Sequence, residues 1–147
     1  MTSRQWNQIR RIAVLVLAVL VFVEPVGAVE VIVNRDVTAT HLTSLELRAI
    51  FTMRLRTWPD GLPIRVFVLG DNATAQVEFS KKILDMFPYQ LRRYWDRLVF
   101  SGTGQAPIEL NSVEEMRDRV ASTPGAIGYL PDNLVDNRIR VVKVGNQ

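Results

Sequence analysis

The hydrophobic pattern of the chain changes from continuous to alternating and then to helical. An unbroken apolar run covers residues 12–23, and residues 29–34 then alternate around three valines, which predicts a first strand. Further strands are predicted over 64–70, over 126–130 and, near the end, over 138–144. The 64–70 segment is largely apolar, as expected of a strand that is buried on both faces.

Apolar residues at helical spacing separate these strands. A short helix is predicted after Thr43, which forms a capping box with Glu46, and it ends near Thr52. Three more helices are predicted. The first covers about 73–86, and the third runs from the capping box of Ser112 and Glu115 to about residue 122. In the second, an inward apolar face is formed by Leu91, Tyr94, Trp95 and Leu98, which predicts that Trp95 lies in the core. Residues 100–110 are expected to form a glycine-punctuated loop. Strands that alternate with helices predict a single α/β domain with a mainly parallel sheet flanked by helices, since parallel neighbours need helical crossovers.

Two glycines mark the entry to the strand at 126–130. Pro124 and Gly125 directly follow the last predicted helix and supply the fixed φ and the positive φ of a type II turn. Gly128 then lies inside the strand. A glycine at such a position indicates that another backbone or a ligand approaches closely, because a side chain would not fit.

The first 28 residues have the pattern of a signal peptide. A basic stretch that ends in Arg10 and Arg11 precedes the apolar run, and the small residues Gly27 and Ala28 follow it. The run is 12 residues long, whereas a membrane-spanning helix needs roughly 20. We therefore expect cleavage after Ala28, a mature periplasmic domain over 29–147 and no membrane span after cleavage; a retained N-terminal anchor is the alternative.

Charge and composition exclude several classes of function. The chain has 18 basic and 15 acidic residues, and three of the basic residues and one of the acidic residues belong to the leader. The mature surface is therefore nearly neutral, and nucleic acid is not an expected partner. There is no cysteine and only one histidine, His41, so thiolate metal sites are excluded and no cofactor is expected. No serine lies on a Gly-x-Ser-x-Gly elbow that could pair with His41, and we expect no enzyme activity.

Three segments, LTSLELRAIFTMRLRTWPDGLPI, RLVFSGTG and TPGAIGYL, together resemble the phosphate-type periplasmic substrate-binding proteins of ABC transporters. The resemblance spans essentially the whole mature chain. It implies the type 2 periplasmic-binding fold, in which two lobes close on an anion, and the mature chain corresponds to roughly one lobe.

The resemblance also indicates where an anion would bind. The family holds phosphate with an arginine followed by an Asp-Gly-Ser-Gly-Thr loop at the start of a helix. Here Leu69 stands where the arginine is expected, and the loop is reduced to Gly70, Asp71, Asn72, Ala73 and Thr74. Asn72, Thr74 and the backbone at 70 and 73 are the candidate donors. Asp71 is expected to cap the helix and to place a carboxylate where the anion would lie.

Two other polar segments are candidates. Thr38, Thr40 and His41 follow the first strand, at the edge where open α/β sheets bind ligands, or they form an ordinary polar loop. The Ser-Gly-Thr-Gly stretch at 101–104 could cradle an anion through its amides, or it could be a plain loop. Arg92, Arg93 and Arg97 form a basic helix face that is either solvated or a docking surface for an acidic partner.

Two functional hypotheses follow. The first is an exported solute-binding domain that binds a small anion such as phosphate, weakly or as a homo-oligomer in which a second copy supplies the other lobe. The second is a periplasmic protein-interaction module that keeps the fold and has lost the ligand. The family motifs favour the first hypothesis, and the missing arginine and missing lobe favour the second.

Overall fold

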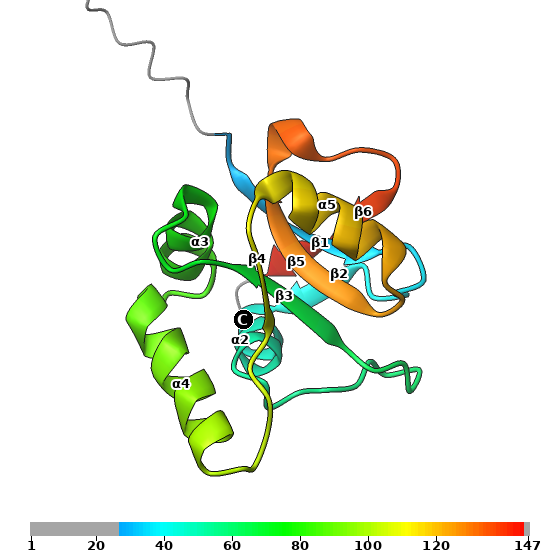
Figure 1. The fold of residues 1–147 in the computed structure, drawn as a ribbon. Coiled ribbons are helices and arrows are strands. Elements are labelled where there is room, and N and C mark those ends of the chain that lie inside the picture. The colour runs from blue at the N-terminus through cyan, green and yellow to red at the C-terminus, as the bar shows by residue number, and fades with distance from the viewer. Residues whose placement is uncertain (1–26, 146–147) are drawn as a thin grey trace, which may run out of the picture.

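The computed structural model describes residues 27–145 (Figure 1). Its strands are β1 (Val29–Asn34), β2 (His41–Thr43), β3 (Arg65–Leu69), β4 (Ile108–Leu110), β5 (Ala126–Pro131), β6 (Ile139–Val141) and β7 (Lys143–Gly145). Its helices are α2 (Ser44–Phe51), α3 (Thr74–Glu78), a π-helical turn (Phe79–Ile83), α4 (Pro88–Phe100), α5 (Val113–Ser122) and a short 3-10 helix (Asp132–Leu134). All but two residues of the predicted signal peptide lie outside the described part, and β1 begins at Val29.

The central sheet is mixed but mainly parallel, as the sequence predicts. Its strand order is β4-β3-β5-β1-β6. β3 runs parallel to β4 and β5, whereas β1 runs antiparallel to both of its neighbours, so four strands share one direction and β1 opposes them. Each parallel neighbour of β3 is reached through helices, α3 and α4 before β4 and α5 before β5 (Figure 1). The predicted α/β class is confirmed.

The short helix α2 begins at the predicted capping box. The Glu46 N–H donates to Thr43 Oγ1 at 3.1 Å, and the Thr43 N–H donates to Glu46 Oε2 at 2.8 Å. The Glu46 carboxylate accepts from both the N–H and the hydroxyl of Thr43, and these two hydrogen bonds hold the pKa of Glu46 below its usual value. The second predicted box forms only in part: Ser112 Oγ accepts from the Glu115 N–H, but the Glu115 carboxylate accepts from the N–H of Asn111 instead of closing on Ser112.

Helix α4 packs through fewer residues than its apolar spacing predicts. Leu91 and Trp95 are buried, and Trp95 Nε1 donates to the Phe51 carbonyl at 2.8 Å, so the prediction that Trp95 lies in the core is confirmed. Tyr94, predicted to face inward, is 41% exposed. A narrow strip of α4 therefore contacts the body of the protein, and the rest of its surface is open to solvent.

The turn before β5 forms as predicted, and Gly128 has a different neighbour from the one expected. Gly125 has a φ of +73°, and the Ala126 N–H donates to the Thr123 carbonyl at 3.2 Å. A Cβ on Gly128 would lie 2.5 Å from the Sδ atom of Met116. The space over Gly128 is thus filled by a side chain of α5, and neither another backbone nor a ligand is needed to explain this glycine.

Two strand predictions are corrected by the sheet. Residues 100–110, expected to be a loop, end in strand β4, which pairs with β3. The closing strand predicted over 138–144 is divided at Val142, whose N–H donates to the Val31 carbonyl at 2.9 Å. The chain changes sheets there, because β6 pairs with β1 whereas β7 pairs with β2.

Candidate anion-binding loop

The loop at residues 70–74 leaves β3 at the carboxyl end of the strand and leads into α3. The Ala73 N–H donates to the Gly70 carbonyl at 2.9 Å, which closes a tight turn. Ala73 is the N-cap of α3, and no side chain caps this helix. The expectation that Asp71 caps the helix is therefore wrong, since its carboxylate is engaged elsewhere. Asn72 and Thr74 are exposed, whereas Gly70 and Ala73 are half-buried.

Asp71 forms a two-point ion pair with Arg92 of α4. Arg92 Nε lies 3.1 Å from Asp71 Oδ2, and Arg92 Nη2 lies 2.9 Å from Asp71 Oδ1. Nη2 also donates to Oε2 of Glu109, on β4, at 2.8 Å. The guanidinium lies 5.1 Å from the centre of the Trp95 ring. Hydrogen bonds to Asp71 and to Glu109 raise the pKa of Arg92, so its charge is permanent.

This ion-pair cluster gives the loop a cation that its own sequence does not contain. Arg92 is 21 residues from Asp71 in the chain, and the sequence groups it with Arg93 and Arg97 on one basic helix face. The structure separates them, because Arg92 turns toward the loop. No local pattern identifies this pairing, since it depends on how α4 packs beside β3 and β4. One guanidinium with two carboxylates leaves the cluster with a net charge of −1.

Leu69, where the family resemblance places an arginine, belongs to the core. Its side chain is 3% exposed, and its N–H donates to the Tyr129 hydroxyl at 2.7 Å. Tyr129 in turn donates to Gln76 Oε1 of α3. Burial raises the pKa of Tyr129, so the hydroxyl stays protonated and joins β3, β5 and α3 below the loop. Gln76 Nε2 is buried with no hydrogen-bond partner within the described residues.

Thr38 follows the carboxyl end of β1, whereas Thr40 and His41 lead into β2, which pairs with β7 in the second, two-stranded sheet. Val33, near the end of β1, is paired with Ile127, and Ile127 is paired with Val66, near the start of β3. The carboxyl end of β1 therefore meets the amino end of β3, because β1 is the antiparallel strand. The expectation that the end of β1 lies at the edge where open α/β sheets bind ligands is therefore wrong.

The Ser-Gly-Thr-Gly stretch at 101–104 ends helix α4. The amides of Thr103 and Gly104 both donate to the Leu98 carbonyl, and the amide of Gly102 donates to the Val99 carbonyl. These donors satisfy the last carbonyls of the helix and do not face a common anion site. The structure supports the plain-loop interpretation of this segment.

Several proteins of known structure have a fold similar to that of this chain. An ABC-type phosphate transport receptor from Vibrio cholerae superimposes with a TM-score of 0.63 at 15% identity, over 80% of this chain and 46% of that one. PstS from Borrelia burgdorferi superimposes with a TM-score of 0.61 at 16% identity, over 80% of this chain and 47% of PstS. The chain shares the fold of phosphate transport receptors. A third protein, from Clostridium perfringens, is assigned as a phosphate ABC transporter substrate-binding protein and was solved with bound phosphate. It superimposes with a TM-score of 0.65 at 19% identity, over 80% of this chain and 44% of that one.

The chain spans less than half the length of each of these receptors. No protein-family model and no curated protein matches its sequence. Among residues 27–145 there is no cluster of three or more acidic or histidine side chains that could hold a metal ion. Within the same part of the chain, no helix is long and apolar enough to span a bilayer.

Proposed function

We propose that this protein is an exported domain with the fold of a phosphate transport receptor, in which the loop at 70–74 binds a small oxyanion such as phosphate weakly, with Arg92 as its cationic contact. The observation that carries the proposal is the position of the Arg92 guanidinium beside Asp71, two residues after Leu69, where the resemblance expects an arginine. The exposed side chains of Asn72 and Thr74 are further donors within the same loop. The bound phosphate in the Clostridium perfringens protein supports this class of ligand.

The two carboxylates set the strength of this interaction. An anion must displace Asp71 or Glu109 from Arg92, and it must approach a cluster that already carries a net negative charge. Charge-assisted hydrogen bonds contribute about 1.5–3 kcal/mol each, so giving up one of them costs about a factor of ten or more in affinity. We expect the dissociation constant for phosphate to be no tighter than the millimolar range.

Calorimetric titration of the wild type and of a variant without the two carboxylates, each with phosphate, tests the proposal. D71N/E109Q removes both competing charges and keeps the shape of the side chains, and it should bind phosphate at least tenfold more tightly than the wild type. Adding R92A to this variant should abolish the gain, whereas adding R93A should leave it unchanged. Replacing Leu69 by arginine is not a useful test, because that side chain is buried.

Two results would overturn this proposal. If D71N/E109Q binds phosphate no better than the wild type while keeping its melting temperature within a few degrees, Arg92 is not an anion contact. If the unmodified protein binds phosphate in the micromolar range and sedimentation analysis shows a homo-oligomer, a second subunit supplies the donors. A monomer with micromolar affinity would place the site elsewhere, with Thr38 to His41 as the first segment to test.

A protein-interaction module is the second candidate function. It is favoured by the aromatic side chains that α4 exposes, including Phe100, which is 88% exposed. In this alternative the ion pairs of Arg92 serve only to hold α4 against the sheet. Failure of D71N/E109Q to bind phosphate, sulfate or molybdate would favour this module over the anion-binding function.

A further inference from the structure

The large exposed aromatic side chains of the described residues all lie in one short segment. They are Phe87, Tyr89, Tyr94 and Phe100. This segment comprises the residue before α4 and the helix itself, which stands to the side of the sheet in Figure 1. Exposed aromatic groups concentrated on one element are typical of a surface that is covered in the functional state.

Four residues of α4 form a continuous line on the outer face of the helix. Tyr89, Arg93, Arg97 and Phe100 are spaced by four, four and three positions, so they follow one another along the same face. All four are exposed, whereas the core residues Leu91 and Trp95 occupy the opposite face. We name these four residues the α4 stripe. At 1.5 Å per residue it is about 16 Å long, or three helical turns.

The charge of the α4 stripe is available to a partner. Within residues 27–145 neither Arg93 nor Arg97 forms an ion pair, in contrast to Arg92, which has two carboxylate partners. The Arg93 guanidinium lies 5.8 Å from the centre of the Tyr89 ring. Asp96 is exposed next to the stripe and offsets one of the two charges. The stripe therefore presents a modest positive charge between two aromatic groups.

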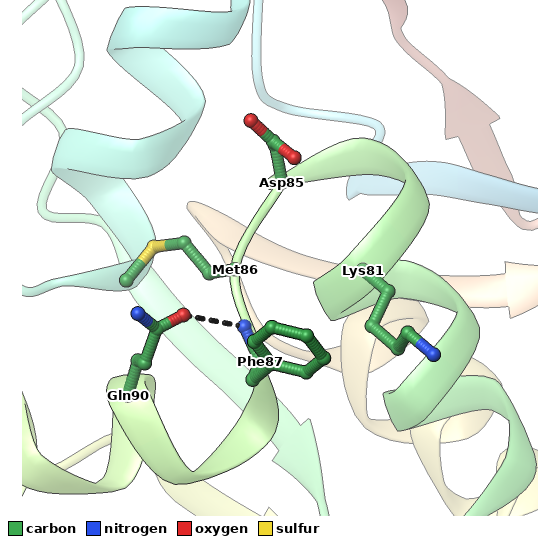
Figure 2. A pocket seen from close by; sticks show the side chains of 5 residues that line it. All are labelled: Lys81, Asp85, Met86, Phe87 and Gln90. Atoms are coloured by element: carbon green, nitrogen blue, oxygen red, sulfur yellow. Dashed lines mark hydrogen bonds between the residues drawn. The ribbon is translucent and has the colours of Figure 1, made fainter.

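A concave pocket continues the α4 stripe at its amino end. The Tyr89 ring stacks on that of Phe87 at 5.7 Å, and Lys81 Nζ lies 5.7 Å from the Phe87 centroid. Figure 2 shows Phe87 with Lys81, Asp85, Met86 and Gln90 around this pocket, which has a volume of about 340 Å³. The Phe87 N–H donates to Gln90 Oε1, which fixes the rim of the pocket. Asp85 Oδ2 forms an ion pair with Arg48 Nη2 at 3.3 Å.

We propose that the α4 stripe and this pocket dock an acidic helical segment of a partner protein. Two carboxylates of the partner would meet Arg93 and Arg97, and an apolar side chain next to them would enter the pocket beside Phe87. Arginine, tyrosine and phenylalanine are the residues enriched at the centre of protein interfaces, and a pocket for an anchoring side chain is a usual feature of such sites. The proposal is independent of anion binding, because Arg92 and the loop at 70–74 contribute nothing to it.

Charge and shape favour this occupant over two others. Two copies of the stripe packed antiparallel would place Arg93 against Arg97 of the second copy, and like charges in contact oppose association. An anionic lipid surface is flat and would leave the pocket unfilled. An acidic helix offers carboxylates to the two arginines and a side chain to the pocket, and a helix of three turns has the same length as the stripe.

Binding of two synthetic helical peptides tests the proposal. The acidic peptide has 15 residues, with glutamates one turn apart and flanking leucines on one face, and the control peptide replaces each glutamate by lysine. Fluorescence anisotropy should show at least tenfold tighter binding of the acidic peptide, with an affinity that falls as salt is added. R93E/R97E and, separately, Y89A/F100A should each weaken that binding at least fivefold. R35E/K143E, which changes the net charge equally on exposed residues of other elements, should leave it within twofold.

Each other outcome counts against the docking proposal. Equal binding of both peptides, no binding of the acidic peptide at millimolar concentration, or no effect of R93E/R97E would overturn it. Sedimentation with vesicles of phosphatidylglycerol and phosphatidylethanolamine provides the second arm of the test. If the protein binds these vesicles through the α4 stripe and does not bind the acidic peptide, the surface is a lipid contact and the proposal is wrong. Circular dichroism melts of every variant verify that the fold is intact.

Discussion

Replacing Gly125 by alanine should destabilise this fold through two separate effects. The backbone at Gly125 has a φ of +73°, a region that costs an L-residue about 1–2 kcal/mol. A Cβ there would also overlap the carbonyl oxygen of Pro63, which belongs to the backbone and cannot rotate away. The Gly125 carbonyl accepts hydrogen bonds from Trp58 Nε1 at 3.0 Å and from the Arg65 N–H at 3.1 Å, so any shift of the turn disturbs the start of β3.

Gly102 offers a matched control for the conformational effect. Its φ is +68°, close to that of Gly125, but nothing lies within 4 Å of a Cβ placed there. The reduced entropy of the unfolded chain offsets about 0.4–1 kcal/mol of the backbone cost in both variants. We therefore expect Gly102→Ala to lose about 1 kcal/mol of unfolding free energy. Overpacking against Pro63 adds about 1–3 kcal/mol, which brings the expected loss for Gly125→Ala to about 2–4 kcal/mol.

Urea unfolding followed by circular dichroism measures both losses, and thermal melts provide a second measurement. For a domain of this size about 1 kcal/mol corresponds to about 4 °C in melting temperature, so Gly125→Ala should melt about 8–16 °C below the wild type and Gly102→Ala about 4 °C below it. If the two variants differ by less than about 0.5 kcal/mol, close to the limit of such measurements, the contact with Pro63 does not exist and the reasoning is refuted.

Two further predictions concern Tyr129 and the N-terminus. Tyr129→Phe should cost about 1–3 kcal/mol at neutral pH, because it leaves the Leu69 N–H and Gln76 without their partner. The pKa of Tyr129 is raised in the folded protein, so above about pH 10 the tyrosine ionises first in the unfolded chain and the wild type loses stability. The Phe variant should lose less stability over that range, and an equal loss in both proteins would contradict this. Intact-mass analysis of exported protein should find a chain that starts at Val29, and a chain that retains Met1 in the membrane fraction would show an anchor instead.

The elements that the sequence predicts correctly depend on neighbours in the chain. The alternation of 29–34 gives β1, the Thr43 and Glu46 pair opens α2, and the Pro124–Gly125 dipeptide forms the turn before β5. Each involves residues within a few positions of one another, so backbone geometry and a local hydrogen bond are sufficient to specify it. The order of these elements also predicts the α/β class, because helices between strands allow parallel pairing.

The candidate sites depend on contacts that no local pattern specifies. The direction of β1 is set by its pairing with β5, nearly 100 residues away in the chain, and this direction places the chain that leaves β1 at the edge opposite the loop at 70–74. The covering of Gly128 by Met116 likewise follows from the packing of α5. The sequence by itself determined where the helices, turns and candidate loop lie. Only the tertiary structure decided that Arg92 joins Asp71 and Glu109 while Arg93 and Arg97 stay exposed, because the environment of a charged side chain depends on which elements pack beside it.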